Sequence, residues 1–347
     1  MRFPLSLLFG MSRYMCWQRV FGKRKFPLVL MLEPLHACNL CCSGCGRIRE
    51  YSETLSRCLS VDECVNSILE SGSPIVSICG GEPLIYPNIL ELVDRTLRLG
   101  KFIYLCTNGQ LLESRLPDFC ELAKNNSRAR SRLYWNVHID GVAKTHDSIV
   151  GKNGAFEIAI NGIKAAKREK FFVYTNTTLY SQTTVDELVE LAEKLKLLRV
   201  DGMMLAPGYG YDAVKDGKNK NNANDFFLTR SKICEKFREI RTRLKKFRIT
   251  TTPTFMDFLC GERKLPCAAW ANPTRNVKGW KSPCYLVTDK HYETYNQFID
   301  LTDWSKIGYG NDPRCEDCMM HCGYEPSAVL FANKFTDLIR LALWQIS

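Results

Sequence analysis

The chain has 347 residues, of which 45% are hydrophobic, and a formal net charge of +11. This composition supplies the core of one large domain or two moderate ones, and we find no internal repeat or low-complexity segment. Seventeen cysteines, bunched into two short-spaced groups, favour metal ligation over the disulfide framework of a small secreted chain. No uninterrupted apolar run approaches the roughly 20 residues that span a bilayer. Residues 1–17 show no clear signal-peptide cleavage site, so we expect a cytoplasmic protein.

From about residue 27 the sequence alternates short apolar runs with helical patterns. A helix is expected over 60–72, with Ser60 as N-cap, Glu63 completing a capping box and Gly72 ending it. Alternating strands and helices predict parallel strands joined by helical crossovers. Six such units predict an α/β fold built on a partial (β/α)6 barrel, with functional residues at the carboxyl ends of its strands. Strands are expected over 26–34, 74–81, 101–109, 132–141, 171–180 and 201–207, and further helices over 88–100, 154–170, 184–198 and 229–246.

Three regions follow from this pattern. Residues 1–26 form an N-terminal amphipathic segment, and residues 27–248 form the barrel, with the polar stretch 215–225 as a surface loop. After about residue 250 the alternation stops, and residues 249–347 form a smaller region rich in Pro, Trp and Cys.

Cys38, Cys42 and Cys45 form a C-x3-C-x2-C motif directly after the first predicted strand, with Cys41 as the extra cysteine. Thiolates this close in sequence bind one small inorganic body, either zinc or an iron–sulfur cluster. A structural zinc site usually has a fourth Cys or His ligand, and Cys58 and His36 are only weak candidates. A cubane cluster held by three thiolates instead leaves one iron open to a substrate. Zinc, or buried cysteines without metal, is the alternative.

Polar motifs end the next three strands in order, and a fourth motif lies within the fifth strand. The three are GGEP (Gly80, Gly81, Glu82, Pro83), TNG with Asn108, and HIDG with His138 and Asp140, and the fourth is TNT with Asn176. Together with the cysteine motif, this series resembles the radical S-adenosylmethionine (SAM) superfamily. The resemblance implies a 4Fe–4S cluster on the three cysteines, with SAM as its fourth ligand. It also implies that these strand tips contact SAM or the substrate.

Longer motifs resemble one family within that superfamily, the adenosylhopene transferases of hopanoid biosynthesis. The likeness runs from Pro27 to Pro326 and includes 27–51, GGEPL, YLCTN, PGY.Y, NPTRNV.GW..PCYL, TDW and HCGYEP. It implies that a 5′-deoxyadenosyl radical from SAM adds to the alkene of a hopene such as diploptene and forms adenosylhopane. SAM is then consumed as a cosubstrate, and a donor such as flavodoxin or ferredoxin supplies the electron.

Cys106, in YLCTN, is the expected hydrogen-atom donor to the carbon radical that such an addition leaves. A thiol S–H bond is weak enough for this step. The alternative is a buried Cys that packs as a small apolar residue.

The basic and aromatic residues of the N-terminal segment are typical of a membrane-surface helix. A triterpene substrate and the net positive charge fit peripheral contact with the inner face of a membrane. The equal alternative is an amphipathic helix that covers the base of the barrel. Nucleic acid is not expected as a partner, because the basic stretch 238–248 lacks interleaved aromatic residues.

The second cysteine group lies near the C-terminus. Its first pair has a C-x11-G-x4-C spacing, which resembles the auxiliary-cluster domains of many radical SAM enzymes. We expect a candidate second iron–sulfur cluster there, with zinc or no metal as the alternative. The four expected ligands are Cys267, Cys284, Cys315 and Cys318, with Cys322 as a substitute.

Two other functions stay open from the sequence. One is a radical SAM enzyme that abstracts hydrogen from a peptide or small molecule and releases free 5′-deoxyadenosine. The other is a non-catalytic, zinc-stabilised protein that binds nucleic acid or a partner. The GGEP strand tip argues against the second, because a zinc loop does not need it.

Overall fold

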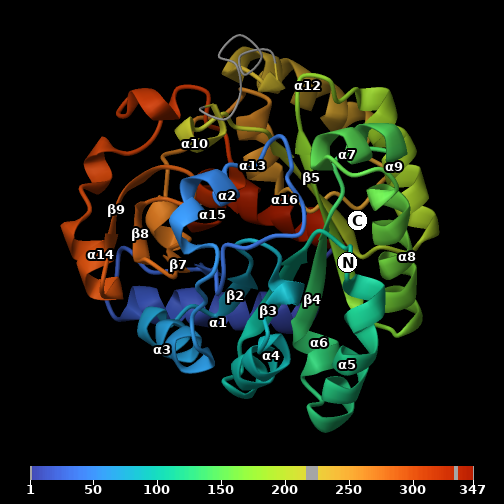
Figure 1. Ribbon diagram of the computed structural model, residues 1–347. Coiled ribbons are helices and arrows are strands. Elements are labelled where there is room, and N and C mark those ends of the chain that lie inside the picture. Colours follow the sequence, from blue (N-terminus) through green and yellow to red (C-terminus); the bar gives the residue numbers. More distant parts are fainter. Residues whose placement is uncertain (1, 216–225, 332–334, 347) are drawn as a thin grey trace.

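The computed structural model describes residues 2–215, 226–331 and 335–346. Its centre is one sheet of nine strands in the order β6-β5-β4-β3-β2-β1-β7-β8-β9. The first six strands along the chain pair in parallel, each with its sequence neighbour, which confirms the predicted α/β partial barrel (Figure 1). They are β1 (Val29–Leu32), β2 (Ile75–Ile78), β3 (Phe102–Thr107), β4 (Leu133–His138), β5 (Phe172–Leu179) and β6 (Gly202–Pro207). Most of the polar stretch 215–225 lies outside the described residues.

Helices connect these strands and form the outer layer of the barrel (Figure 1). All four residues of strand β2 are buried, so both faces of the sheet are covered at this strand. The longer crossover helices are α3 (Val61–Ser71), α4 (Ile89–Arg98), α5 (Leu112–Asn125), α8 (Ala155–Arg168), α9 (Val185–Leu197) and α12 (Arg230–Arg243). Shorter helices lie in the connections: α2 (Arg47–Glu50), α6 (Ala129–Arg132), α7 (Ala143–Val150) and α10 (Asp212–Lys215).

Helix α3 begins and ends where the sequence predicts. Ser60 and Glu63 form a reciprocal capping box, with Glu63 N donating to Ser60 Oγ at 3.2 Å and Ser60 N donating to Glu63 Oε2 at 2.7 Å. Gly72 ends the helix at φ +67°, in the left-handed region where glycine is favoured.

The Cys-rich region continues the same sheet. Strand β7 pairs in parallel with β1, so that Met31 lies opposite Thr274, and β8 and β9 follow in antiparallel order. These strands are β7 (Thr274–Asn276), β8 (Gly279–Pro283) and β9 (Thr288–Tyr292), and the helices of the region are α13 (Pro253–Leu259), α14 (Tyr295–Leu301), α15 (His321–Leu330) and α16 (Phe335–Ile346).

Helix α1 (Leu5–Val20) covers the amino-terminal end of the barrel. Its Leu7 packs on Ile75 and Phe102, the first residues of β2 and β3. The two ends of the chain meet there, because Arg2 Nε donates to Trp344 O at 2.9 Å. No helix of the described segments is long and apolar enough to cross a bilayer.

Candidate active site

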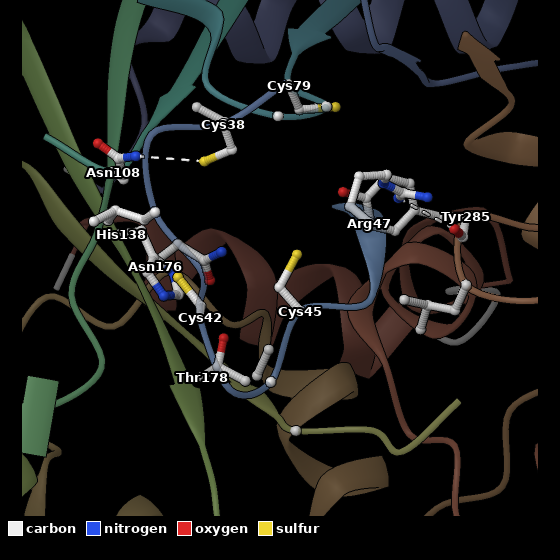
Figure 2. Close-up of a pocket in the computed structure, with 18 of the residues that line it drawn as sticks. Cys38, Cys42, Cys45, Arg47, Cys79, Asn108, His138, Asn176, Thr178 and Tyr285 are labelled. Carbon is white, nitrogen blue, oxygen red and sulfur yellow. Dashed lines mark hydrogen bonds between the residues drawn. The ribbon is translucent and has the colours of Figure 1, made fainter. Parts of the chain in front are cut away.

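The three cysteines of the first motif lie on one loop at the carboxyl ends of the strands and line the same pocket. Figure 2 shows the sulfur atoms of Cys38, Cys42 and Cys45 pointing toward a shared space. Two backbone hydrogen bonds hold the loop: Cys45 N donates to Cys42 O at 3.1 Å, and Ser43 N donates to Ile149 O at 2.7 Å. Cys41, the extra cysteine, is exposed.

The electrostatics of this loop favour a positively charged occupant. Burial, with smaller contributions from the negative charges of Glu82 and Cys45, raises the pKa of the Cys38 thiol to about 11. Burial also raises the pKa of Cys42, followed by the charges of Cys45 and Asp140. Three thiolates at this position would therefore repel one another unless a metal body neutralised them. The donor set and its location fit a cluster held by three thiolates.

The GGEP tip packs directly on the cysteine loop. Gly80 adopts φ +105°, and a Cβ on Gly81 would lie 1.8 Å from Ala37 O. The glycines are therefore needed for close approach of two backbones, and Glu82 N donates to Ala37 O at 2.9 Å. This packing fixes the position of Glu82 relative to the cysteines.

Glu82 is buried, and three donors surround its carboxylate. Thr107 Oγ1 and Leu84 N donate to Oε1 at 2.8 and 3.0 Å, and Asn108 N donates to Oε2 at 2.8 Å. Burial raises the pKa of Glu82, and these three hydrogen bonds oppose the rise. A carboxylate has about four acceptor positions, so one position on Oε2 is left for a donor inside the pocket.

The remaining polar strand residues lie beside Cys38 and Cys42 (Figure 2). Asn108 Nδ2 donates to Cys38 Sγ at 3.7 Å (Figure 2), and His138 and Asn176 also line the pocket. Asn176 Oδ1 is buried with no hydrogen-bond partner, which leaves an acceptor for a ligand.

Two predicted contact residues, Asp140 and Pro83, do not line the pocket. Asp140 instead holds His138, with Oδ2 lying 2.7 Å from His138 Nε2, and accepts from Thr178 N at 2.7 Å through Oδ1.

Cys106 also lines this pocket, from strand β3. Its Sγ lies 3.3 Å from Ser77 Oγ, and Asn136 Nδ2 donates to it at 3.5 Å. Burial raises the pKa of Cys106, so the side chain is a thiol at neutral pH. Its S–H group is therefore available inside the pocket that the cluster cysteines line.

Sequence reasoning missed several lining residues. Asn136 carries a usable signal, because it lies two positions before His138 on β4 and so faces the same side. Arg47 and Tyr285 show no comparable pattern, since they meet only in the folded chain.

The five C-terminal cysteines gather at a second place, and none of them lines the pocket described above. The charges of Cys318, Cys284 and Cys315 all act on Cys267, whose pKa burial raises first. No three His, Cys, Asp or Glu side chains of the described residues are arranged to hold a single metal ion. The three thiols of the first cysteine loop are likewise not arranged around a single ion.

A backbone hydrogen bond reaches these cysteines, since Val287 N donates to Cys284 Sγ at 3.3 Å. Gly323 and Gly308 pack against Cys267, where a Cβ would lie 2.5 and 2.9 Å from its side chain. Backbone N–H groups of Ala269, Gly308 and Met320 oppose the rise that burial causes in the pKa of Cys267, Cys315 and Cys318, whereas at Cys322 this contribution comes from its own backbone.

Comparison with known sequences matches both halves of the chain. Residues 32–195 match the model of the Radical SAM superfamily, and residues 203–340 match a domain of unknown function, DUF3463. The AdoMet-dependent heme synthase of Methanosarcina barkeri is 32% identical over 188 residues, which are 52% of this chain and 51% of that protein. The pre-heme d1 synthase of Dinoroseobacter shibae is 27% identical over 79% of this chain and 68% of that protein. The chain spans about half the length of the first curated relatives it matches.

Solved structures show the same fold at low identity. Streptococcus suis SuiB, bound to its precursor peptide SuiA, has a TM-score of 0.59 at 12% identity, over 89% of this chain and 74% of that chain. Native anSMEcpe with bound AdoMet has a TM-score of 0.55 at 16% identity, over 92% of this chain and 99% of that chain.

Proposed function

We propose that this chain, whose residues 32–195 match the Radical SAM superfamily, adds the 5′-deoxyadenosyl group of SAM to the alkene of a hopene such as diploptene, forming adenosylhopane. Radical SAM proteins use a 4Fe–4S cluster with SAM. The hopene substrate rests on the long motifs between Pro27 and Pro326, since none of the relatives described above is named for a hopene. The structural observation that supports the proposal is Cys106, a protonated thiol in the same pocket as the cluster cysteines.

The pocket divides the tasks between its walls. Cys38, Cys42 and Cys45 would hold the cluster, and the free acceptor position of Glu82 suits the ammonium group of SAM. The same role in holding SAM is proposed for the GGEP backbone, Asn108, His138 and Asn176, with Asp140 positioning His138. When bound, the cluster and SAM supply a 5′-deoxyadenosyl radical after one-electron reduction.

An alkene held against that radical would form one C–C bond as its π bond breaks, which leaves a tertiary carbon radical. Cys106 would donate its S–H hydrogen atom to this carbon and saturate the product. The thiyl group left on Cys106 must then regain one electron and one proton, which the flavodoxin or ferredoxin class of donor and solvent would supply. Ser77 and Asn136 hold the sulfur in place for this transfer.

An apolar wall beside the SAM end suits a hydrocarbon substrate. Tyr209, Tyr285, Leu286 and Met320 line the pocket there, next to a buried cluster that includes Tyr180 and Tyr211. Each Å² of apolar surface removed from water contributes about 25 cal/mol, so such a wall favours a triterpene over a charged peptide.

A second iron–sulfur cluster is part of the same proposal. Cys267, Cys284, Cys315 and Cys318 are the expected ligands, because a backbone N–H of another residue favours the thiolate at each of them, and hydrogen bonds to the sulfurs tune iron–sulfur clusters. Cys322 lacks such a donor and is the substitute ligand. Residues 249–347 would then act as an auxiliary-cluster domain.

The deciding experiment is an anaerobic assay of the reconstituted protein with SAM, a strong reductant and diploptene, read by mass spectrometry. An adenosyl–hopane adduct supports the transferase. Free 5′-deoxyadenosine without adduct contradicts it and favours the second candidate, hydrogen abstraction from a peptide or small molecule. The precursor peptide bound to SuiB is a reason to test peptides first in that case.

Metal analysis tests the clusters separately. About eight iron and eight sulfide per chain would support two 4Fe–4S clusters, and about four of each would support one. Zinc in place of iron at both sites would instead support the non-catalytic interpretation.

A further inference from the structure

Helix α16 carries its polar side chains inward and its apolar side chains outward. Its two buried side chains are Asp337 and Gln345. Asp337 accepts two hydrogen bonds from Arg263, both at 2.8 Å, and Gln345 Nε2 donates to Phe3 O at 2.6 Å. Arg340 pairs with Asp257 at 2.6 Å. A helix on a water-soluble surface normally has the opposite arrangement, so the outer face of α16 calls for an apolar neighbour.

That outer face is one continuous stripe. Phe335 is 76% exposed and Ile346 is 67% exposed. Between them the spacing of three and four residues places four more exposed apolar side chains on the same side of the helix, whereas Leu341 and Trp344 are half-buried. The stripe consists of Phe335, Leu338, Ile339, Ala342, Leu343 and Ile346.

Helix α1 adds further exposed apolar side chains, with the polar Ser12 and Arg13 exposed between them. Phe9 is 72% exposed, Trp17 63% and Val20 80%. The rings of Trp17 and Phe21, just beyond the helix end, lie tilted against each other with centroids 4.5 Å apart. Of the seventeen exposed large apolar side chains in the described residues, ten lie on α1, on α16 or at Phe21. We call these ten side chains the basal face.

The two helices run in opposite directions across the amino-terminal end of the barrel. Arg19, in the last turn of α1, donates to Leu330 O at 2.7 Å, shortly before α16 begins. Arg2, before the first turn of α1, bonds Trp344 at the end of α16. Figure 1 shows both helices behind the strands and the two chain ends near each other. The basal face therefore belongs to one end of the molecule, opposite the pocket.

The charges around the basal face are positive. Residues 1–32 contain six Lys and Arg residues and no Asp or Glu. Arg13, Lys23, Arg24 and Lys25 are exposed, and the one acidic residue of α16, Asp337, is buried against Arg263. We propose that the basal face, formed by α1 and α16 together, docks on the surface of a bilayer that contains anionic lipid.

The composition of the face favours lipid over protein. Interfacial helices combine an apolar and aromatic side with flanking Lys and Arg, and α1 with its following residues has this pattern. A second copy of the chain would bring like charges together, which opposes self-association. The pocket opens at the other end of the barrel, so docking leaves it accessible. The proposal does not depend on the identity of the substrate.

Vesicle flotation of the reconstituted full chain tests the proposal without any substrate. Wild type should float with phosphatidylglycerol–phosphatidylcholine vesicles and much less with phosphatidylcholine alone. Each Lys or Arg near an anionic surface contributes about fivefold in affinity. The triple variant Lys23→Gln, Arg24→Gln, Lys25→Gln should therefore partition on the order of 100-fold more weakly.

A second variant tests the apolar contribution of α16. Leu338→Gln combined with Leu343→Gln should abolish flotation while iron content stays at the wild-type level. Ile158→Gln is the control and should float like wild type, because Ile158 is exposed in the first turn of α8, at the carboxyl ends of the strands and away from the basal face.

Three results would overturn the proposal. They are absence of wild-type flotation, equal flotation of the Leu338/Leu343 variant and wild type, and equal loss of flotation in the Ile158 control. Light scattering tests the other occupant, a second copy of the chain. If wild type does not float but is a dimer, and the Leu338/Leu343 variant is a monomer, the basal face is a dimer interface.

Discussion

Arg47 Nη2 lies 2.8 Å from Glu33 Oε1, and the two side chains are 4% and 0% exposed. Arg47 also bonds Glu50 at 3.1 Å and lies over the Tyr285 ring, 4.6 Å from its centroid. Burial alone would raise the pKa of Glu33, but the charge of Arg47, with smaller contributions from His36 and Lys281, lowers it to about 2. This pair ties strand β1 and the helix after the cysteine loop to the residues around Cys284.

Arg47→Met should lower stability by about 3–5 kcal/mol, because it leaves the Glu33 charge buried without its partner. Thermal unfolding under anaerobic conditions measures the change. Adding Glu33→Gln to Arg47→Met should recover part of the loss. The exposed Arg57→Met is the control and should change stability by less than about 0.5 kcal/mol. Equal stability of Arg47→Met and wild type would show that the pair does not hold the two regions together.

Glu82→Gln should weaken SAM binding by roughly 10- to 100-fold, the range expected for losing a charge-assisted hydrogen bond. The amide also puts a donor against the Thr107 and Asn108 donors that now surround the carboxylate. Equilibrium dialysis with labelled SAM measures the change, and iron content confirms that the cluster is still present. The surface variant Glu113→Gln is the control. Unchanged SAM affinity would remove Glu82 from the SAM site.

Cys106→Ala should still cleave SAM and form the C–C bond, but the saturated product should disappear. In D2O the wild-type thiol exchanges its proton, so the wild-type product should carry one deuterium at the quenched carbon. Cys79→Ala is the matched control, since Cys79 is a second buried thiol that lines the same pocket. Saturated product from Cys106→Ala at the wild-type rate would end the proposed role.

Glu325→Gln should change the pH dependence of stability. Burial raises the pKa of Glu325 to about 7, opposed only by a hydrogen bond from Thr252 N. A carboxyl group whose pKa is higher in the folded state favours folding most below its unfolded value of about 4.5, and this contribution is lost as pH rises toward 7. Between pH 5 and 8 wild type should lose roughly 1–3 kcal/mol relative to the variant. If the stabilities of the two proteins change equally with pH across this range, the raised pKa of Glu325 is refuted.

The sequence predicted the barrel well because its signals are local. Ser60, Glu63 and Gly72 mark the ends of α3 within thirteen residues, and each strand tip that follows carries its own polar motif. The position of Cys106 in the pocket also followed from strand order, since consecutive parallel strands place their carboxyl ends at one edge.

The parts that local signals could not predict depend on distant segments. Arg47 meets Tyr285 only after the chain has returned to the sheet, 238 residues later. The inverted orientation of α16 is set by Arg263, Asp257 and Phe3, none of which is near it in sequence. Strand β7 is three residues long and carries no alternating pattern that would announce its pairing with β1.

The pairing of β7 with β1 also limits how this protein can be divided or evolved. Strand β1 lies between β2 and β7, so its backbone groups are satisfied on both sides. A chain cut at residue 248 would turn β1 into an open edge beside the cysteine loop, and open edges recruit strands from other molecules. The Cys-rich region, residues 249–347, therefore cannot be exchanged on its own. A graft from a relative would have to bring a strand that pairs with β1 as well as a suitable linker.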